Sequence, residues 1–332
     1  RIEMHSAVGA GTTMTLTLSL PLADVADLPP PAQGSRIGTL AAMLAHRRSQ
    51  PSVQEAEADG TLVLVVDDHP TNRGVLMHQL RALGYAAESA VNGVQGLALW
   101  QSRRFGAVIT DCNMPEMDGY ALARHIRRLE GPTGRRVPII ACTANALDGE
   151  AHACLQAGMD DYLAKPIEIT RLMKVLDRWL PHPDSTGTVL PAPAEAATPV
   201  PSTAPPAGPT RATATLDTTI LPSLVGDDPD LLRQIYRDFQ RSAADDLATL
   251  RRAAAGRDAD ELARAGHRVC GASRSVGATA LAQMAEDLQR VEGPVDWVAV
   301  DKRVAALDSE WQRLSLQLQQ CTRLSTQPEP AR

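Results

Sequence analysis

The sequence predicts a multidomain chain in which an α/β doubly wound domain with five parallel strands is followed by an all-α four-helix bundle. In the first region, short apolar runs alternate with segments of helix length, a pattern typical of a parallel sheet that is covered on both faces. In the second region, apolar residues recur at steps of three and four along several long segments. A stretch rich in proline, alanine and threonine separates the two regions and is typical of a linker.

Five short apolar or β-branched runs are expected to form the strands, at residues 62–66, 86–90, 107–111, 137–143 and 162–165. Five segments have the length and spacing of helices, at residues 72–84, 94–103, 120–129, 149–157 and 167–180. In the first of these helices Leu76, Leu80 and Leu83 keep helical spacing, and Gly84 stands where a helix commonly ends. This five-fold alternation predicts the doubly wound sheet.

Polar side chains follow the strands at one edge of the expected sheet, namely Asp67, Asp68, Asp111, Thr143 and Lys165. Ligands of such sheets bind at this edge, outside the carboxyl ends of the strands. An aspartate at a single strand end is ordinarily a turn or cap residue. Three carboxylates together, however, would repel one another unless a divalent ion such as Mg²⁺ lay among them. With that ion and the ammonium of Lys165 nearby, Asp111 would stay ionised and act as a nucleophile toward phosphorus.

Four motifs of this region, VVDD, DCNMPEMDG, CTANA and YLAKP, resemble the receiver domain of two-component signalling in order and spacing. The resemblance covers residues 61–180 and implies that Asp111 is the phosphoacceptor. The Mg²⁺ ligands that it implies are Asp67 through water, Asp68, Asp111 and the carbonyl of Asn113. It also implies that Thr143 and Tyr162 shift on phosphorylation and that Lys165 neutralises phosphoryl charge.

The first residues contain a strand-like pattern, GAGTTMTLTLSLPL, in which Met and Leu alternate with Thr and Ser. This stretch resembles the last glycine box and final strand of a histidine-kinase ATP-binding domain, whose GxGT motif corresponds to Gly9, Ala10, Gly11 and Thr12. The resemblance implies that the chain begins inside a longer protein, and that the ATP-binding kinase core lies outside this sequence. We therefore assign residues 1–23 to the tail of that domain and residues 24–60 to a linker.

Four to five amphipathic helices follow a second linker at residues 181–213 and predict a bundle at residues 214–322, before a disordered tail at residues 323–332. The buried stripe of the central helix recurs at steps of three and four and comprises Leu262, Ala265, Val269, Ala272 and Val276. His267 lies about 200° round the helix from the neighbouring members of that stripe. We therefore expect its side chain to point at solvent.

The residues around His267 suit a transient phosphohistidine. Gly271 leaves room for the surface of another protein, and Arg264 and Arg274 flank the same face. The stretch HRVCGASRSVGA resembles the motif of histidine phosphotransfer (HPt) domains, which implies that His267 is the phosphorylated histidine. Cys270 stands where that family usually has a lysine, and the two arginines are candidates to compensate.

The order of kinase tail, receiver, linker and HPt domain resembles the cytoplasmic end of BvgS-type unorthodox hybrid sensor histidine kinases. The resemblance implies a His-Asp-His phosphorelay in which Asp111 takes a phosphoryl group from a kinase histidine outside this chain and passes it to His267. His267 would then deliver it to a separate response regulator. The parent would be an ATP-dependent, homodimeric kinase anchored in the inner membrane, whereas this segment would perform only phosphoryl transfer in the cytoplasm.

Two other functions compete with the relay. A metal-dependent aspartyl phosphatase also uses an aspartate at the end of a parallel strand. Such sites typically show a DxD motif, and the run Asp67, Asp68, His69 lacks that spacing. A signalling scaffold with an inactive HPt site is suggested by Cys270.

The composition argues against several further classes of function. A net charge of −6 and only 3% aromatic residues give neither the basic surface nor the stacking platform of a nucleic-acid-binding protein. No run approaches the roughly 18 apolar residues of a membrane helix, so we expect no membrane contact in this segment. Five cysteines without a CxxC pair favour a reducing cytosol over a disulfide framework.

Overall fold

The computed structural model of the protein describes residues 2–7, 11–16, 51–131, 136–143, 148–180, 215–289 and 295–323. The chain divides into two units, Arg1–Ala45 and His46–Arg332, which are described separately. In the first unit, β1 (Ile2–Ala7) pairs antiparallel with β2 (Gly11–Leu16). The strand expected from the alternating pattern is therefore confirmed over β2, whereas its partner β1 was not foreseen. Gly9, Ala10 and the linker at residues 181–213 lie outside the described residues.

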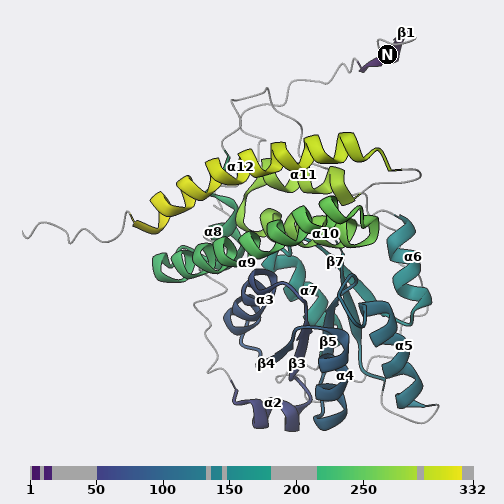
Figure 1. The fold of residues 1–332 in the computed structure, drawn as a ribbon. Helices are drawn as coiled ribbons and strands as arrows, with labels where there is room; N and C mark the ends of the chain where they lie inside the picture. The colour runs from purple at the N-terminus through teal and green to yellow at the C-terminus, as the bar shows by residue number, and fades with distance from the viewer. Residues whose placement is uncertain are drawn as a thin grey trace, which may run out of the picture. The chain divides into compact units, whose positions relative to one another are not determined.

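A five-stranded parallel sheet is the centre of the second unit's first domain (Figure 1). Its strands are β3 (Val63–Val66), β4 (Ala87–Ala90), β5 (Ala107–Asp111), β6 (Ile139–Thr143) and β7 (Asp161–Ala164). They lie in the order β4-β3-β5-β6-β7, and every neighbouring pair is parallel. The chain thus leaves β3 toward one edge and returns to its other side at β5. This switch point between β3 and β5 is where ligands bind in doubly wound sheets, and the predicted fold class is confirmed.

Helices cover both faces of the sheet. On one face, α3 (Pro70–Ala82) and α7 (Ile169–Trp179) pack in a core that includes Val65 and Ile109. On the other, α4 (Gly93–Ser102), α5 (Gly119–Glu130) and α6 (Asp148–Gln156) share a core with Leu64 and Val66. The central strands β3, β5 and β6 are buried throughout, with alternate side chains in two different cores, which is why they form nearly continuous apolar runs. The edge strands β4 and β7 are partly exposed.

The helix α2 (Val53–Asp59) corrects the assignment of residues 24–60 to a linker. Ser52 and Glu55 form a capping box, in which the Ser52 hydroxyl accepts from the Glu55 amide and the Glu55 carboxylate accepts from the Ser52 amide. Ala56 is buried in the core beneath the sheet, and Gly60 ends the helix in the left-handed conformation. The domain therefore begins before the first strand.

The second domain is a bundle of four long helices preceded by a short one, α8 (Ile220–Val225). The long helices are α9 (Pro229–Gly256), α10 (Ala259–Val276), α11 (Thr279–Gln289) and α12 (Trp297–Arg323). They share one apolar core, in which Phe239 of α9 meets Trp311 of α12 edge to face with ring centroids 6.2 Å apart. The predicted four-helix bundle is confirmed. Across the described ranges, no helix has both the length and the apolar character needed to cross a membrane.

The α/β domain and the bundle touch through α3, which packs against α8, α9 and α10 (Figure 1). Val75 of α3 belongs to the apolar core of the bundle. Gln79 donates hydrogen bonds through Nε2 both to Ile167 O of its own domain, at 2.7 Å, and to Leu224 O of α8, at 3.1 Å. This contact is called the α3–bundle interface below.

Candidate functional site

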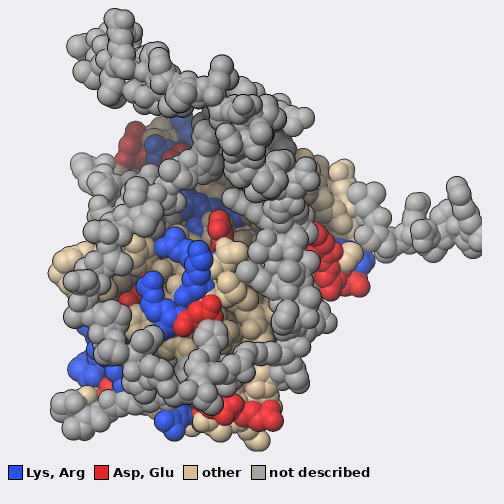
Figure 2. Space-filling view, turned by 180° about the vertical axis from the view of Figure 1, so that it is seen from behind, with Lys and Arg blue, Asp and Glu red and all other residues tan. Residues whose placement is uncertain are grey.

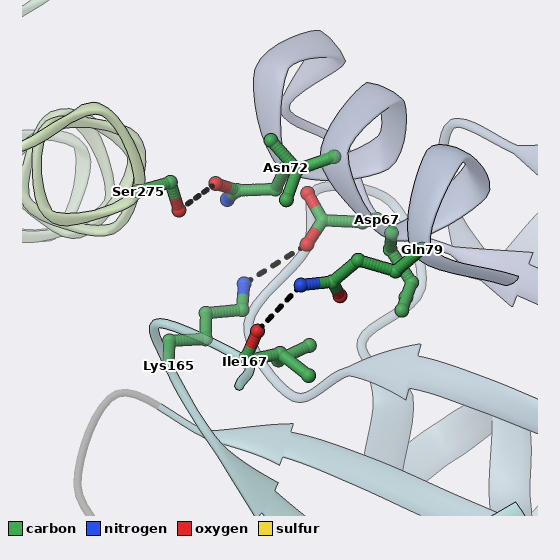
Figure 3. A pocket seen from close by; sticks show the side chains of 8 residues that line it. Asp67, Asn72, Gln79, Lys165, Ile167 and Ser275 are labelled. Carbon is green, nitrogen blue, oxygen red and sulfur yellow. Dashed lines mark hydrogen bonds and ion pairs between the residues drawn. The ribbon is translucent and has the colours of Figure 1, made fainter. Parts of the chain in front are cut away.

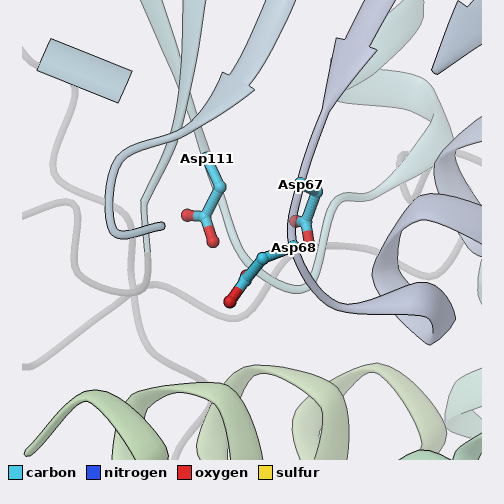
Figure 4. A group of neighbouring side chains, drawn as sticks. All are labelled: Asp67, Asp68 and Asp111. Atoms are coloured by element: carbon cyan, nitrogen blue, oxygen red, sulfur yellow. The ribbon is translucent and has the colours of Figure 1, made fainter. Parts of the chain in front are cut away.

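Three aspartates meet at the switch point of the sheet (Figure 4). Asp111 is the last residue of β5, and Asp67 and Asp68 directly follow β3, its parallel neighbour. Carboxylate oxygens of the three residues all lie within 4.8 Å of one another. Asp67 and Asp111 are buried, whereas Asp68 is half-buried. The convergence predicted from the strand ends is therefore confirmed.

Lys165, at the end of β7, supplies the cation of this cluster. Its Nζ lies 2.9 Å from Oδ2 of Asp67 and 2.8 Å from Oδ2 of Asp111. Burial lowers the pKa of the Lys165 ammonium, but the carboxylates of Asp111 and Asp67 outweigh burial and hold that pKa well above its usual value. The second oxygen of Asp111, Oδ1, accepts from the Cys112 amide at 2.8 Å. The Asp111 carboxylate is thereby fixed in orientation from both sides.

The charge of the site fits a divalent cation. Burial, and after it the charges of Asp111 and Asp67, raises the pKa of Asp68 to about 7. One ammonium beside three carboxylates leaves an excess of negative charge, and carboxylate oxygens are the ligands that Mg²⁺ prefers. Asn113, whose carbonyl was expected to take part, lies exposed in the loop that follows Asp111.

The other predicted residues of the α/β domain lie on the two strands beyond β5. Thr143 is buried at the end of β6, so that it reaches the same edge of the sheet as Asp111. Tyr162 is half-buried on β7, and the guanidinium of Arg171 lies over its ring, 5.7 Å from the centroid. Thr143 and Lys165 are thus next to each other, since the Lys165 amide donates to the Thr143 carbonyl at 2.8 Å.

His267 is buried, which corrects the expectation that it points at solvent. Only 6% of this residue on α10 is exposed, because the α/β domain covers the face that the bundle core leaves open. Figure 4 shows a helix of the bundle crossing opposite the three carboxylates. Burial lowers the pKa of the imidazole, and the carboxylate of Asp111 opposes that shift. Neither ring nitrogen has a hydrogen-bond partner of ordinary geometry within the described ranges, so the neutral ring keeps an available lone pair.

Gly271 and Ser275 continue the face of His267, at steps of four along α10. The Ser275 hydroxyl donates to Oδ1 of Asn72 on α3 at 3.0 Å (Figure 3). A Cβ added at Gly271 would meet Nδ2 of the same asparagine at 3.6 Å, which is ordinary contact. Asn72 of the α/β domain therefore lies next to Gly271, and a side chain larger than alanine there would meet it.

Cys270 is placed differently from expectation, and both predicted arginines have acidic partners within the bundle. Cys270 is 1% exposed and belongs to the apolar core of the bundle, so it does not face the His267 surface. Arg264 pairs with Glu261 of its own helix at 2.9 Å, and Arg274 pairs with Glu286 of α11 at 2.7 Å. The two arginines thus pair with acidic residues of the bundle.

Arg268 is the basic residue that sequence reasoning missed. Its Nε lies 2.8 Å from Oδ1 of Asp246 on α9, and its charge acts on Asp68 of the α/β domain. The helical spacing did not reveal it, because Arg268 lies about 100° round the helix from His267. Only the docked α/β domain shows which basic residues of α10 face a partner.

Two family models match the chain. Residues 63–177 match the response regulator receiver domain, and residues 234–321 match the Hpt domain.

Among curated relatives, the virulence sensor protein BvgS of Bordetella bronchiseptica is 34% identical over 298 residues, which are 87% of this chain and 22% of BvgS. The sensor histidine kinase RcsC of Escherichia coli is 42% identical over 128 residues, which are 38% of this chain and 13% of RcsC. The chain therefore spans about a fifth or less of the length of these relatives.

Among solved structures, the receiver domain of sensor histidine kinase PA1611 from Pseudomonas aeruginosa, which holds a magnesium ion in its active site cleft, is 46% identical. It covers 36% of this chain and 97% of its own, with a TM-score of 0.34.

Proposed function

Because this chain is a phosphorelay segment in which a response regulator receiver domain is followed by an Hpt domain, we propose that Asp111 accepts a phosphoryl group and passes it to His267. The observation that carries the proposal is the burial of His267 against the Asp111 site, although the two residues belong to different domains. A histidine covered by the acidic edge of a receiver has one evident chemical use there, namely exchange of a phosphoryl group with the aspartate.

The residues of the site suit each step of this transfer. The Asp111 carboxylate attacks phosphorus and forms an acyl phosphate, while the donor leaves. Mg²⁺ held by Asp67, Asp68, Asp111 and the Asn113 carbonyl would supply charge neutralisation when bound. Lys165, 2.8 Å from the Asp111 carboxylate, neutralises the phosphoryl oxygens. Thr143 donates a hydrogen bond to the phosphoryl group and, with Tyr162, shifts when Asp111 is phosphorylated.

The second transfer uses the neutral imidazole. A nitrogen lone pair of His267 attacks phosphorus as the bond to the Asp111 oxygen breaks, and the electron pair of that bond restores the carboxylate. Burial favours the neutral ring and therefore the nucleophilic form. Lys165 then resumes its pair with the regenerated carboxylate. His267 afterwards yields the group to a separate response regulator.

The relatives suggest where the phosphoryl group comes from. BvgS and RcsC are sensor proteins of which this chain spans a small part, and RcsC is a histidine kinase by name. We infer that a kinase histidine of the same parent protein, which lies outside this sequence and is phosphorylated by ATP, passes its phosphoryl group to Asp111. On the same ground we propose a homodimeric parent anchored in the inner membrane, with this segment in the cytoplasm and residues 1–23 at the end of the ATP-binding domain.

The structure removes the observation that favoured an inactive scaffold, because Cys270 lies in the bundle core and not on the transfer surface. The site geometry does not favour the aspartyl phosphatase hypothesis. Asp67 and Asp68 are adjacent residues at the end of one strand, without the DxD spacing of such enzymes.

Labelling of the intact chain with acetyl phosphate and Mg²⁺ tests the proposal. The unaltered chain should carry both a hydroxylamine-sensitive acyl phosphate and a base-stable phosphohistidine. His267→Gln should retain only the acyl phosphate, and Asp111→Asn should carry neither label. Phosphohistidine at His267 in the Asp111→Asn chain would show that the histidine does not depend on the aspartate.

A further inference from the structure

A charged contact beside the reacting side chains joins the two domains at Asp246 of α9. Oδ1 of Asp246 lies 2.8 Å from Nε of Arg268, within the bundle. Oδ2 lies 3.2 Å from Nε2 of His69, in the receiver, at an ion-pair distance without hydrogen-bond alignment. The exposed fractions are 14% for the Asp246 side chain, 16% for Arg268 and 2% for His69. This set of three residues is called the Asp246 bridge.

The N-cap role of His69 determines which ring nitrogen lies toward this carboxylate. His69 is the N-cap of α3, and its Nδ1 accepts from the Thr71 amide at 3.2 Å. In a neutral ring whose Nδ1 accepts, the proton is on Nε2. That nitrogen lies 3.2 Å from Oδ2 of Asp246. The capping role of His69 therefore fixes which end of the ring meets the bundle.

Asp246 enters the interface as an anion. Burial raises its pKa, but the His69 ring and the Arg268 guanidinium outweigh burial and lower that pKa. A buried carboxylate that loses one of two partners keeps its desolvation cost without the compensating attraction. A receiver with an acidic or apolar residue in place of His69 would impose that loss on docking.

We propose that the Asp246 bridge is the specificity-determining contact through which this Hpt domain selects receivers that present an N–H donor or a cation directly after their paired aspartates. The inference deepens the proposed function and rests on it, since it concerns which receiver docks before phosphoryl transfer. None of the three residues touches the reacting atoms. The Asp246 bridge therefore governs docking, while Asp111, Lys165 and His267 govern chemistry.

A charge-reversal cycle in the intact chain tests this role. His69→Asp keeps a good N-cap for α3 but places a carboxylate opposite Asp246. Asp246→Lys places one ammonium against both His69 and the guanidinium of Arg268. The double variant restores an opposite-charge pair across the interface. Asp245→Lys is the matched control, because Asp245 is the exposed neighbour on α9 and the change in net charge is the same.

Docking is measured first without any phosphodonor, as the rate at which diethyl pyrocarbonate modifies His267, followed by mass spectrometry. Each single variant should expose His267 and raise this rate at least about tenfold, as expected when one partner of a buried charge pair is lost. The double variant should be protected nearly as well as the unaltered chain, and Asp245→Lys should not differ from it. Equal rates in Asp246→Lys and Asp245→Lys, or no recovery in the double variant, would overturn the proposal.

Phosphohistidine formed from acetyl phosphate, normalised to the total label, is the second measurement. It should fall in both single variants and recover in the double variant. Suppose that His267 is exposed in the single variants and protected again in the double variant, but that no chain forms phosphohistidine. This result would support the docking role of the Asp246 bridge and refute the proposed transfer. Equal phosphohistidine formation in the unaltered chain and in all variants at His69 and Asp246 would support the transfer and refute the role of the Asp246 bridge.

Discussion

Lys165 is buried beside the two carboxylates that it neutralises, and this gives it a structural role in addition to its chemical one. From the sequence alone we expected Lys165 to neutralise the charge of the phosphoryl group. The structure shows that Lys165 lies 2.9 Å from Asp67 and 2.8 Å from Asp111 with all three side chains buried. Removing the ammonium would leave buried anions without their cation, which is costly in a protein interior.

We therefore expect Lys165→Ala to lower the free energy of unfolding by about 3 kcal/mol in EDTA. Millimolar Mg²⁺ should recover part of this loss, because a divalent ion among the same carboxylates replaces the missing positive charge. Chemical denaturation with and without Mg²⁺ measures both effects. Lys174→Ala, at an exposed lysine of α7, is the control and should behave like the unaltered chain. If both variants unfold alike in EDTA, Lys165 does not stabilise the site.

Cys270 gives a second prediction at this scale. Because its side chain lies in the bundle core, Cys270→Lys would bury an ammonium among apolar residues instead of adding a cation to the transfer surface. We expect this change to lower the free energy of unfolding of the bundle by more than about 3 kcal/mol. It should not speed formation of phosphohistidine. Cys270→Ala should cost less, and thermal unfolding of the two variants separates them. Faster transfer in a stable Cys270→Lys chain would contradict the structure.

At the scale of elements, the sequence was most informative where a residue pattern could arise from only one structural environment. The three central strands were predictable because they are buried on both faces and are therefore nearly continuous apolar runs. The acidic cluster was predictable because parallel strands end at one edge of the sheet. The helix α2 was missed because its apolar contribution to the core is small, although the sequence SVQE holds the capping box of Ser52 and Glu55. The hairpin partner β1 was missed because the alternation of Ile2 and Met4 with Glu3 and His5 covers only four residues before Ser6 and Ala7 interrupt it.

The face of α10 was misread for a different reason. Apolar periodicity reports what a bundle buries in its own core, and so it gave the stripe of Leu262 and Val269 correctly. It does not report burial by another domain, which covers His267. It also underestimates how much of a central helix is buried. Because α10 packs against both α9 and α11, Cys270 joins the core beside the stripe. Contacts between distant parts of the chain supplied the missing information.

At the scale of the whole molecule, the state of His267 depends on a domain that begins far from it in the sequence. Its low pKa has burial as the main cause, and the receiver provides that cover. Histidine protonation is disfavoured while the domains are docked. Acid therefore favours the undocked form through this group, and the effect is lost above the usual pKa of histidine, near 6.5.

We expect the His267 ring in the intact chain to titrate below the usual value for histidine, as followed by NMR of its ring protons. Asn72→Arg should raise the observed pKa toward the usual value. A long side chain at position 72 cannot fit against Gly271 and Ser275 and would separate the domains. Arg104→Lys, on an exposed loop away from α3, is a neutral control. An unchanged titration in the Asn72→Arg chain would mean that the bundle alone lowers the pKa.

The occupied face of α10 has a consequence for the flow of signal. On the proposed function, a regulator that takes the phosphoryl group from His267 would need the same surface that the α/β domain of this chain already covers, so the two would compete for it. The resident competitor is tethered, and its effective concentration is on the order of millimolar. The fraction of signal that leaves this protein, as opposed to returning to Asp111, would then rise with the abundance of the regulator. A low concentration of the regulator, as well as absence of the stimulus, would then keep phosphorylation of the regulator low.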